Sequence, residues 1–219
     1  MDENSILVRN LCKRFCKEDE NNETSSGRYT KPQQKKQEPK KQVFAFNGED
    51  QNRLKGIIHF LTQEAGGNVH DKGIVSVTPS SQYTNESIRL AKNVVDFDNL
   101  ETRLLTGNKE NSWLKYDFKD RKVMPTQYSI RSKPFGPSNH HPTDCVIEGS
   151  NNDSDWCLLD SRSGEKSLCA KSVVRTFDIK KAEKGNEYYR YLRIRQTGRN
   201  ACGYFYLGFS ALEYFGTII

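Results

Sequence analysis

Cysteine and histidine side chains are the first candidates for chemistry, because they bind metals and serve as nucleophiles and bases. The chain holds six cysteines and four histidines. Cys12 and Cys16 are separated by three residues, but no second such pair lies nearby, and His140 and His141 are adjacent. No local signature connects a thiol or a serine with a histidine. The pattern therefore predicts neither a structural zinc site nor a nucleophilic enzyme, and it favours buried structural thiols.

Nucleotide and glycosidase chemistry also lack a distinctive pattern. No G-x-G-x-x-G or G-x-x-x-x-G-K-[ST] motif occurs, so a phosphate-binding loop is not predicted. The 28 Asp and Glu residues are enough to supply a carboxylate pair for glycoside hydrolysis, but the sequence singles out no such pair. We therefore expect a protein that is not an enzyme. A catalytic β-sandwich glycoside hydrolase stays open as the third alternative.

Charge is concentrated near the N-terminus. The chain has 219 residues, a net charge of +6 and a mean hydropathy of −0.83. The range 28–41 holds six Lys or Arg side chains against one acidic residue, Glu38. Because residues 1–42 have almost no apolar face to bury, we expect a disordered, basic, polar tail that is solvated. No nucleic-acid partner is expected.

The first residues read Met-Asp-Glu-Asn-Ser, which lacks the cationic start and apolar core of a signal peptide. No apolar run approaches the length needed to span a membrane. The cysteines do not form the dense framework of a small secreted protein. These features predict a cytoplasmic location with free thiols.

Residues 43–219 are typical of an all-β domain. Short runs of aromatic and β-branched residues are bounded by Gly, Pro, Asn, Asp or Ser, and no long helical pattern separates them. The run Leu54–Gly66 is either a short helical turn or an edge strand. We expect a jelly-roll β-sandwich of about eight antiparallel strands. The expected strands are Gly73–Thr78, Trp113–Phe118, Thr126–Ser132, Asp144–Gly149, Trp156–Asp160, Val173–Ile179, Tyr189–Thr197 and Phe209–Gly216.

Alternation assigns the faces of two of these strands. In WLKYDF, the apolar set is Leu114, Tyr116 and Phe118, and in YRYLRIR it includes Leu192 and Ile194. Successive side chains of a strand point to opposite faces, so these sets should face the core. The opposite set of the second strand is rich in arginine and tyrosine, which we expect to be a structural surface. Separately, Trp113 and Trp156 each begin a strand, and both are expected to be largely buried.

Five segments together resemble the discoidin family, also called the coagulation factor V/VIII C-type or galactose-binding-like domain. They are NVVDFDN, NSWLKYDFKDRKVMPTQYSIRS, HPTDCVIEGSNNDSDWCLLD, YYRYLRIRQTG and ALEYFG. Their order and spacing match the family between about Ile57 and Ile219. The chain departs from the pattern at Ser154, where a glycine is usual, and at Cys145, where an aromatic residue is frequent.

The resemblance implies a non-catalytic module that recognises a protein or a glycan. Its ligand would be bound by loops at one end of the sandwich, which correspond here to Gln82–Asn93, Thr106–Asn111 and Lys133–Pro142. The oligomeric state is left open. The candidate ligand-binding residues in these loops are Tyr83, Arg89, Asn108, Lys109, Phe135, His140 and His141.

The resemblance also implies a calcium site, because glycan-binding members of the family hold Ca²⁺ in the aspartate-rich loop with a glutamate from the last strand. The matching residues are Asp96, Asp98 and Glu213. Oxygen ligands of this kind suit Ca²⁺. Phe97, however, stands where a glycine is common. The alternative is that Asp96 caps its turn and Glu213 pairs with an arginine.

The segment GIIHFLTQEAGGNVHDKGIVSVTPSS is similar to intracellular protist versions of the domain that follow BTB-type adaptor regions. This similarity implies a second function, an adaptor in a ubiquitin-ligase context whose basic tail docks another partner. The sequence contains no BTB region.

Overall fold

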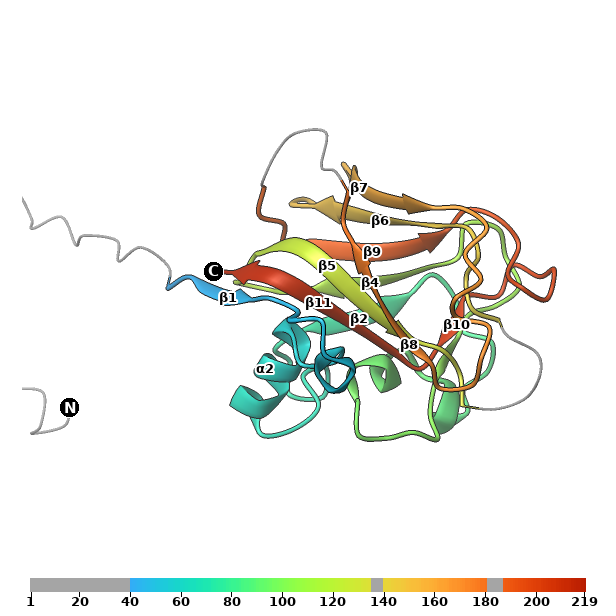
Figure 1. Ribbon diagram of the computed structural model, residues 1–219, viewed down its shortest axis with the longest axis horizontal. Coiled ribbons are helices and arrows are strands. Elements are labelled where there is room, and N and C mark those ends of the chain that lie inside the picture. The colour runs from blue at the N-terminus through green and yellow to red at the C-terminus, as the bar shows by residue number, and fades with distance from the viewer. Residues whose placement is uncertain (1–39, 135–139, 181–186) are drawn as a thin grey trace, which may run out of the picture. The chain divides into compact units, whose positions relative to one another are not determined.

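The computed structural model describes residues 40–134, 140–180 and 187–219, so most of the predicted tail, with Cys12 and Cys16, lies outside the described residues. The range 39–219 forms one compact unit, in which two antiparallel sheets pack face to face (Figure 1). The predicted all-β sandwich is confirmed.

The first sheet has four strands in the order β1-β11-β5-β8. Its long central pair consists of β5 (Val123–Arg131) and β11 (Ala211–Ile218), which run antiparallel with Leu212 opposite Ile130. The flanking strands are β1 (Gln42–Phe44), which begins at the last residue assigned to the tail, and β8 (Val174–Asp178).

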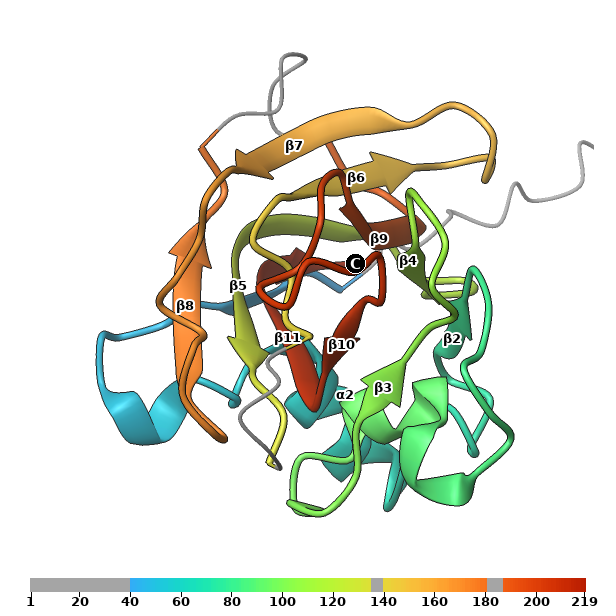
Figure 2. The same cartoon turned by 90° about the vertical axis from the view of Figure 1, so that its right-hand side faces the viewer.

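The second sheet has five strands in the order β2-β4-β9-β6-β7. A third, two-stranded sheet joins β3 to β10 at one end of the sandwich, which faces the viewer in Figure 2. The bounds of these strands are β2 (Ser76–Pro79), β3 (Leu104–Leu105), β4 (Trp113–Asp117), β6 (Cys145–Ser150), β7 (Cys157–Arg162), β9 (Tyr191–Gln196) and β10 (Gly208–Phe209).

The core lies between the two larger sheets, and the alternation predicted for β4 and β9 is confirmed. Leu114, Tyr116, Leu192 and Ile194 are fully buried. Tyr116 also connects the sheets, because its hydroxyl donates to the Leu212 carbonyl oxygen of β11 at 3.1 Å. A buried tyrosine hydroxyl usually has a hydrogen-bond partner. This hydrogen bond links β4 to β11 across the core.

The ambiguous run Leu54–Gly66 contains a helix, α2 (Ile57–Ala65), which packs against β11 (Figure 1). The helix ends at Gly66, whose left-handed backbone (φ 63°) suits a residue without a side chain. Its first turn has no cap from its own N-cap residue, Gly56. The missing cap comes from β11, as described below. Three 3-10 helices complete the fold, namely η1 (Asp50–Asn52), η2 (Ser87–Arg89) and η3 (Ala91–Val95).

Not every predicted thiol is buried. Cys145, on β6, is 3% exposed, and burial raises the pKa of its thiol to about 12. Cys157 is partly buried and Cys169 is exposed. The predicted burial is therefore partial for Cys157, which begins β7 and packs against the core, and wrong for Cys169, which lies in the connection between β7 and β8.

Candidate functional site

Loops from distant parts of the chain meet at the end of the sandwich that carries β3 and β10 (Figure 2). Backbone hydrogen bonds hold them together: Tyr83 N–H donates to the Leu105 carbonyl oxygen at 3.1 Å. The loop between β9 and β10 is fixed by Asn108, whose Oδ1 accepts from Phe205 N–H at 2.8 Å. Residues that are far apart in the sequence are thereby brought side by side.

Aromatic rings gather where these loops meet. The ring centroid of Tyr206 lies 5.5 Å from that of Tyr83, 5.6 Å from that of Tyr204 and 5.3 Å from that of His140. These separations are typical of tilted and edge-to-face aromatic contacts. Tyr83 and Tyr204 are 46% and 49% exposed. The arrangement therefore presents two tyrosine rings to solvent while its neighbours hold them in place.

Cationic groups border the rings. The Arg89 guanidinium carbon lies 5.0 Å from the centroid of Tyr83, within reach of a cation–π interaction. On the other side, the Lys133 Nζ is 2.8 Å from Nδ1 of His140. We call this set the loop-end cluster. Its members are Tyr83, Arg89, Lys133, His140, Tyr204 and Tyr206.

The cluster perturbs its ionisable groups. Burial, together with the positive charge of Arg103, lowers the pKa of Lys133 to about 8. Burial and the Lys133 ammonium lower the pKa of His140 to about 4. At pH 7 the imidazole is therefore neutral, so its Nδ1 accepts a hydrogen bond from the Lys133 ammonium.

The structure brings several of the predicted ligand-binding residues together and separates others. Arg89 and His140 share one end of the sandwich, as their contacts with tyrosines require. Lys109 is exposed in the same loop as Asn108. Phe135 lies outside the described residues. The placement of His141 contradicts its prediction as a loop ligand, because the ring is 1% exposed and its Nε2 faces the Cys169 sulfur at 3.6 Å.

Sequence reasoning missed Tyr204, Tyr206 and Lys133. The two tyrosines stand in YFY between Gly203 and Gly208, and aromatic residues in a glycine-bounded loop are the signal that was available. Lys133 stood inside a predicted loop, but nothing in the sequence indicates that it is only 5% exposed.

The predicted calcium site is not formed by its three carboxylates. Glu213 is fully buried, and its two carboxylate oxygens accept hydrogen bonds from the backbone N–H groups of Gly56, Ile58, His59 and Tyr214 at 2.8–3.0 Å. Burial raises the pKa of this carboxyl group, and the four donors oppose the rise. Glu213 thus caps the N-terminus of α2 and pairs with no arginine among the described residues, so both expectations for it are wrong.

The aspartate-rich loop holds a side-chain cation. Arg131 of β5 is 4% exposed, and its guanidinium donates to the carbonyl oxygens of Phe97 at 2.8 Å and Asn99 at 3.2 Å. Asp96 and Asp98 act on the same guanidinium by raising its pKa, although burial has the larger, lowering effect. Loop carbonyls of the kind that could coordinate Ca²⁺ are therefore directed at Arg131. Within the described residues no group of three or more His, Cys, Asp or Glu is placed to hold a metal ion.

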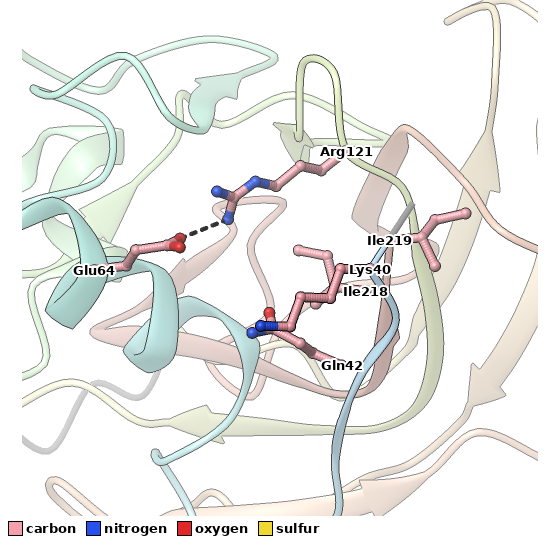
Figure 3. A pocket seen from close by; sticks show the side chains of 6 residues that line it. All are labelled: Lys40, Gln42, Glu64, Arg121, Ile218 and Ile219. Atoms are coloured by element: carbon pink, nitrogen blue, oxygen red, sulfur yellow. Dashed lines mark hydrogen bonds and ion pairs between the residues drawn. The ribbon is translucent and has the colours of Figure 1, made fainter. Parts of the chain in front are cut away.

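Two cavities lie away from the loop-end cluster. One, of about 270 Å³, is bordered by α2, the start of β1 and the end of β11, and the Arg121 guanidinium points across it to Glu64 at 2.9 Å (Figure 3). Lys40 and Ile219 also line it. The other, of about 130 Å³, lies between α2 and the aspartate-rich loop. Neither is lined by a residue predicted to bind the protein or glycan ligand, but Asp96 and Asp98, which were predicted to bind calcium, line the second.

The outer face of the five-stranded sheet is ion-paired. Arg193 and Arg195 both donate to Glu148 at 2.7 Å, which confirms that this arginine-rich face is structural. Trp156 is half-buried beneath Arg193, whose guanidinium carbon is 3.9 Å from its ring. Trp113 is half-buried on the same face. Both indoles therefore pack outside the core, in contrast to the expectation that they are largely buried.

No helix in the described part of the chain is long and apolar enough to cross a membrane.

No protein-family model matches the chain. The E3 ubiquitin-protein ligase Ufd4 of Drosophila melanogaster is 29% identical over 149 residues, which make up 67% of this chain and 5% of that protein. The chain thus spans a small part of the length of this relative.

Solved structures resemble the domain at low identity. The CBM32-5 module of CpGH89 from Clostridium perfringens, in complex with GalNAc-β-1,3-galactose, has a TM-score of 0.52 and 12% identity over 65% of this chain and 96% of its own. CBM32-3 of a family 31 glycoside hydrolase from the same organism has a TM-score of 0.51 and 14% identity, and the match covers 66% of this chain and 92% of that module. The fucolectin of striped bass serum (Morone saxatilis) has a TM-score of 0.50 and 17% identity, and the match covers 65% of this chain and 47% of the fucolectin chain. With its two antiparallel sheets and these neighbours, the domain has the galactose-binding-like, discoidin-type β-sandwich fold.

Proposed function

We propose that the domain is a non-catalytic module that binds a saccharide at the loop-end cluster. The observation that carries the proposal is the pair of half-exposed rings, Tyr83 and Tyr204. Both rings contact the ring of Tyr206. Saccharides present C–H faces that pack on aromatic rings and hydroxyl groups that need polar partners. The cationic and imidazole groups beside the rings offer such partners.

The charges around the cluster favour binding over catalysis. Glycoside hydrolysis uses two carboxyl groups about 5–10 Å apart. Within the described residues, Glu86 is the single carboxylate within ion-pair distance of the cluster's cations, and it pairs with Arg89 at 3.3 Å. No second carboxylate of the described residues pairs with these cations, so the observed contacts give no support to a two-carboxylate mechanism at this position.

The structural neighbours support the same proposal, because they are carbohydrate-binding modules and a lectin. Those ligands belong to the neighbours, whose identities to this chain are below 20%. The saccharide bound here is consequently a matter for direct measurement.

The test is a glycan array probed with the full chain, followed by calorimetric titration of the best saccharide. Tyr204→Ala should weaken binding by about tenfold, which corresponds to about 1.4 kcal/mol. Tyr191→Ala is the matched control, because Tyr191 lies on the outer face of β9, beside Arg190. Equal affinity in wild type and Tyr204→Ala would place the ligand elsewhere, and a blank array would reject saccharide binding.

A second candidate function is recognition of a protein within a ubiquitin-ligase assembly. The observation that favours it is the 29% identity to part of Ufd4. The test is affinity purification with the full chain and with Tyr204→Ala, quantifying ubiquitin-ligase subunits and ubiquitin conjugates. Enrichment that is lost in Tyr204→Ala would support this function at the same surface. No enrichment of ligase components would reject it.

A further inference from the structure

The loop-end cluster contains more positive charge than its own acidic groups balance. Arg89, Arg103 and Lys133 influence one another electrostatically, and Glu86 is the one carboxylate of the described residues within ion-pair distance of Arg89 or Lys133. Glu86 lies 3.3 Å from the Nε of Arg89, and its side chain is 53% exposed. An exposed ion pair of this length contributes little to the free energy of folding. The cluster is therefore a cationic site with a weak internal counterion.

Lys133 is the most unusual of these cations. It is 5% exposed, and its Nζ contacts neutral His140 at 2.8 Å. No carboxylate of the described residues lies within ion-pair distance of it. Buried lysines are ordinarily paired with an acid, because an uncompensated charge is costly away from water. A lysine retained in this position without an acid is typical of a site that receives a negative charge from outside the protein.

Arg89 gives a second, independent indication. Its buried Nε lies 3.3 Å from the exposed Glu86 carboxylate but makes no hydrogen bond within the described part of the chain. A bound anionic group would supply the hydrogen bond that Glu86 does not make. The guanidinium also lies over the Tyr83 ring, so a group held by Arg89 would lie beside the exposed tyrosine face.

We infer that the loop-end cluster selects a saccharide that carries a negatively charged group, a carboxylate or a sulfate, with its sugar ring on Tyr83 and Tyr204 and its anionic group toward Arg89 and Lys133. This inference rests on the proposed function and specifies its ligand class. The tyrosines recognise the ring in any saccharide. The cations then distinguish charged from neutral sugars, because a hydrogen bond to a charged group is stronger than one to a neutral group.

The first experiment compares three probes that differ only at carbon 6: galactose, galacturonic acid and galactose 6-sulfate. Titration of the full chain at pH 7 should give an affinity for at least one anionic sugar that is about tenfold higher than for galactose. The two acidic probes separate a carboxylate preference from a sulfate preference. A Glu-rich hexapeptide tests whether an acidic peptide binds instead.

Variants assign the preference to the cluster. Lys133→Met and Arg89→Gln should each weaken binding of the anionic sugar much more than binding of galactose, so that most of the preference is lost, since the tyrosines that contact the ring stay in place. Lys55→Met is the matched control, because it removes the same charge from an exposed residue outside the cluster. Thermal melts of all variants confirm folding, and Arg89→Gln, at a partly exposed site, remains informative if Lys133→Met does not fold.

A proton-uptake measurement gives a readout that a structural role would not produce. Lys133 has a pKa of about 8, lowered by burial and by Arg103 and Arg89, with Cys202 acting in the opposite direction. Neutral His140 and the buried His141 are the other titratable groups that interact with it. A bound anion stabilises the protonated lysine and raises its pKa, so binding near pH 8.5 should take up protons and affinity should fall above pH 8. Calorimetry in buffers of different ionisation enthalpy measures this uptake, and Lys133→Met should abolish it.

The outcomes separate the inference from the proposed function. Anion preference that depends on Lys133 and Arg89 supports both. Equal, Tyr204-dependent binding of the three sugars would overturn the anion preference and leave saccharide binding intact. No binding of any sugar here and on the array would overturn both. Binding of the acidic peptide alone would overturn saccharide recognition in favour of a protein ligand.

Discussion

Glu213 of β11 caps the first turn of α2, where its Oε1 accepts a hydrogen bond from the backbone N–H of Ile58 at 2.8 Å. The same carboxylate accepts from Gly56 and His59 through Oε2. The first N–H groups of a helix have no partners within the helix, and its N-terminus favours negative charge. Close approach depends on Gly56, because a Cβ there would lie 2.3 Å from the Tyr214 carbonyl oxygen. One side chain thus joins the helix to the central strand of the sandwich.

Glu213→Gln should lower the free energy of unfolding by about 3 kcal/mol, measured by urea denaturation at pH 7. The glutamine amide would turn an NH₂ group toward two backbone N–H donors and leave them without an acceptor. Glu64→Gln is the matched control on the same helix. Its partner is Arg121, its side chain is 49% exposed, and its loss should cost less than about 1 kcal/mol. Equal losses in the two variants would contradict the capping role.

Trp156→Ala should lower the free energy of unfolding by about 1 kcal/mol, because the ring packs on Arg193 at the surface and not in the core. Arg193 retains Glu148 in the variant. Leu192→Ala is the comparison, because Leu192 is next to Arg193 in β9 but points to the opposite, inner face. Since Leu192 is fully buried, its loss should lower the free energy of unfolding by about 3 kcal/mol or more. If the tryptophan variant lost as much as the leucine variant, the assignment of the two faces would be wrong.

The main features of the fold could be predicted because strand periodicity is local. All eight expected strands are present, and Leu114 and Tyr116 face inward because side chains alternate along a strand. The strands that escaped prediction, β1, β3 and β10, have two or three residues each, too few to show alternation. The helix α2 was ambiguous because its cap, Glu213, lies 155 residues from Ile58 in the sequence.

The candidate site was harder to predict because it depends on contacts between distant loops. Asn108 was expected to bind ligand, but its Oδ1 holds Phe205, 97 residues away, and so positions Tyr204 and Tyr206. Nothing local to either loop indicates this pairing. In the same way, the sequence places Asp96 and Glu213 in positions that suit a cation, whereas tertiary packing brings Arg131 to the loop and a helix terminus to Glu213.

Asp117 should make stability depend on pH below about 4. Although burial raises its pKa, hydrogen bonds from Arg190 and Lys119 lower it from 3.8 to about 2. Because the folded protein binds the proton less readily than the unfolded chain, this stabilisation is present above pH 4 and is lost as the pH falls toward 2. Urea denaturation at pH 2–5 should therefore show a steeper loss in wild type than in Asp117→Asn. Parallel pH profiles would contradict the lowered pKa.

Arg131 provides the last prediction, because it stands where the family resemblance implied calcium. Its guanidinium donates to Ser210 Oγ at 3.0 Å and to the carbonyl oxygens of Phe97 and Asn99, so one planar group holds the residue between β10 and β11 and the aspartate-rich loop at once. A lysine has a single nitrogen and cannot reproduce these directions. Arg131→Lys should therefore lower the free energy of unfolding by about 2 kcal/mol, measured by urea denaturation. Lys92→Arg, at an exposed pair with Asp71, is the control substitution and should have little effect on the free energy of unfolding.

Millimolar Ca²⁺ should leave the melting midpoint of the wild type unchanged, since a cation that binds the folded state must raise it. A rise in the wild-type midpoint with Ca²⁺ that Asp98→Asn abolishes would show that the loop binds the metal in spite of Arg131.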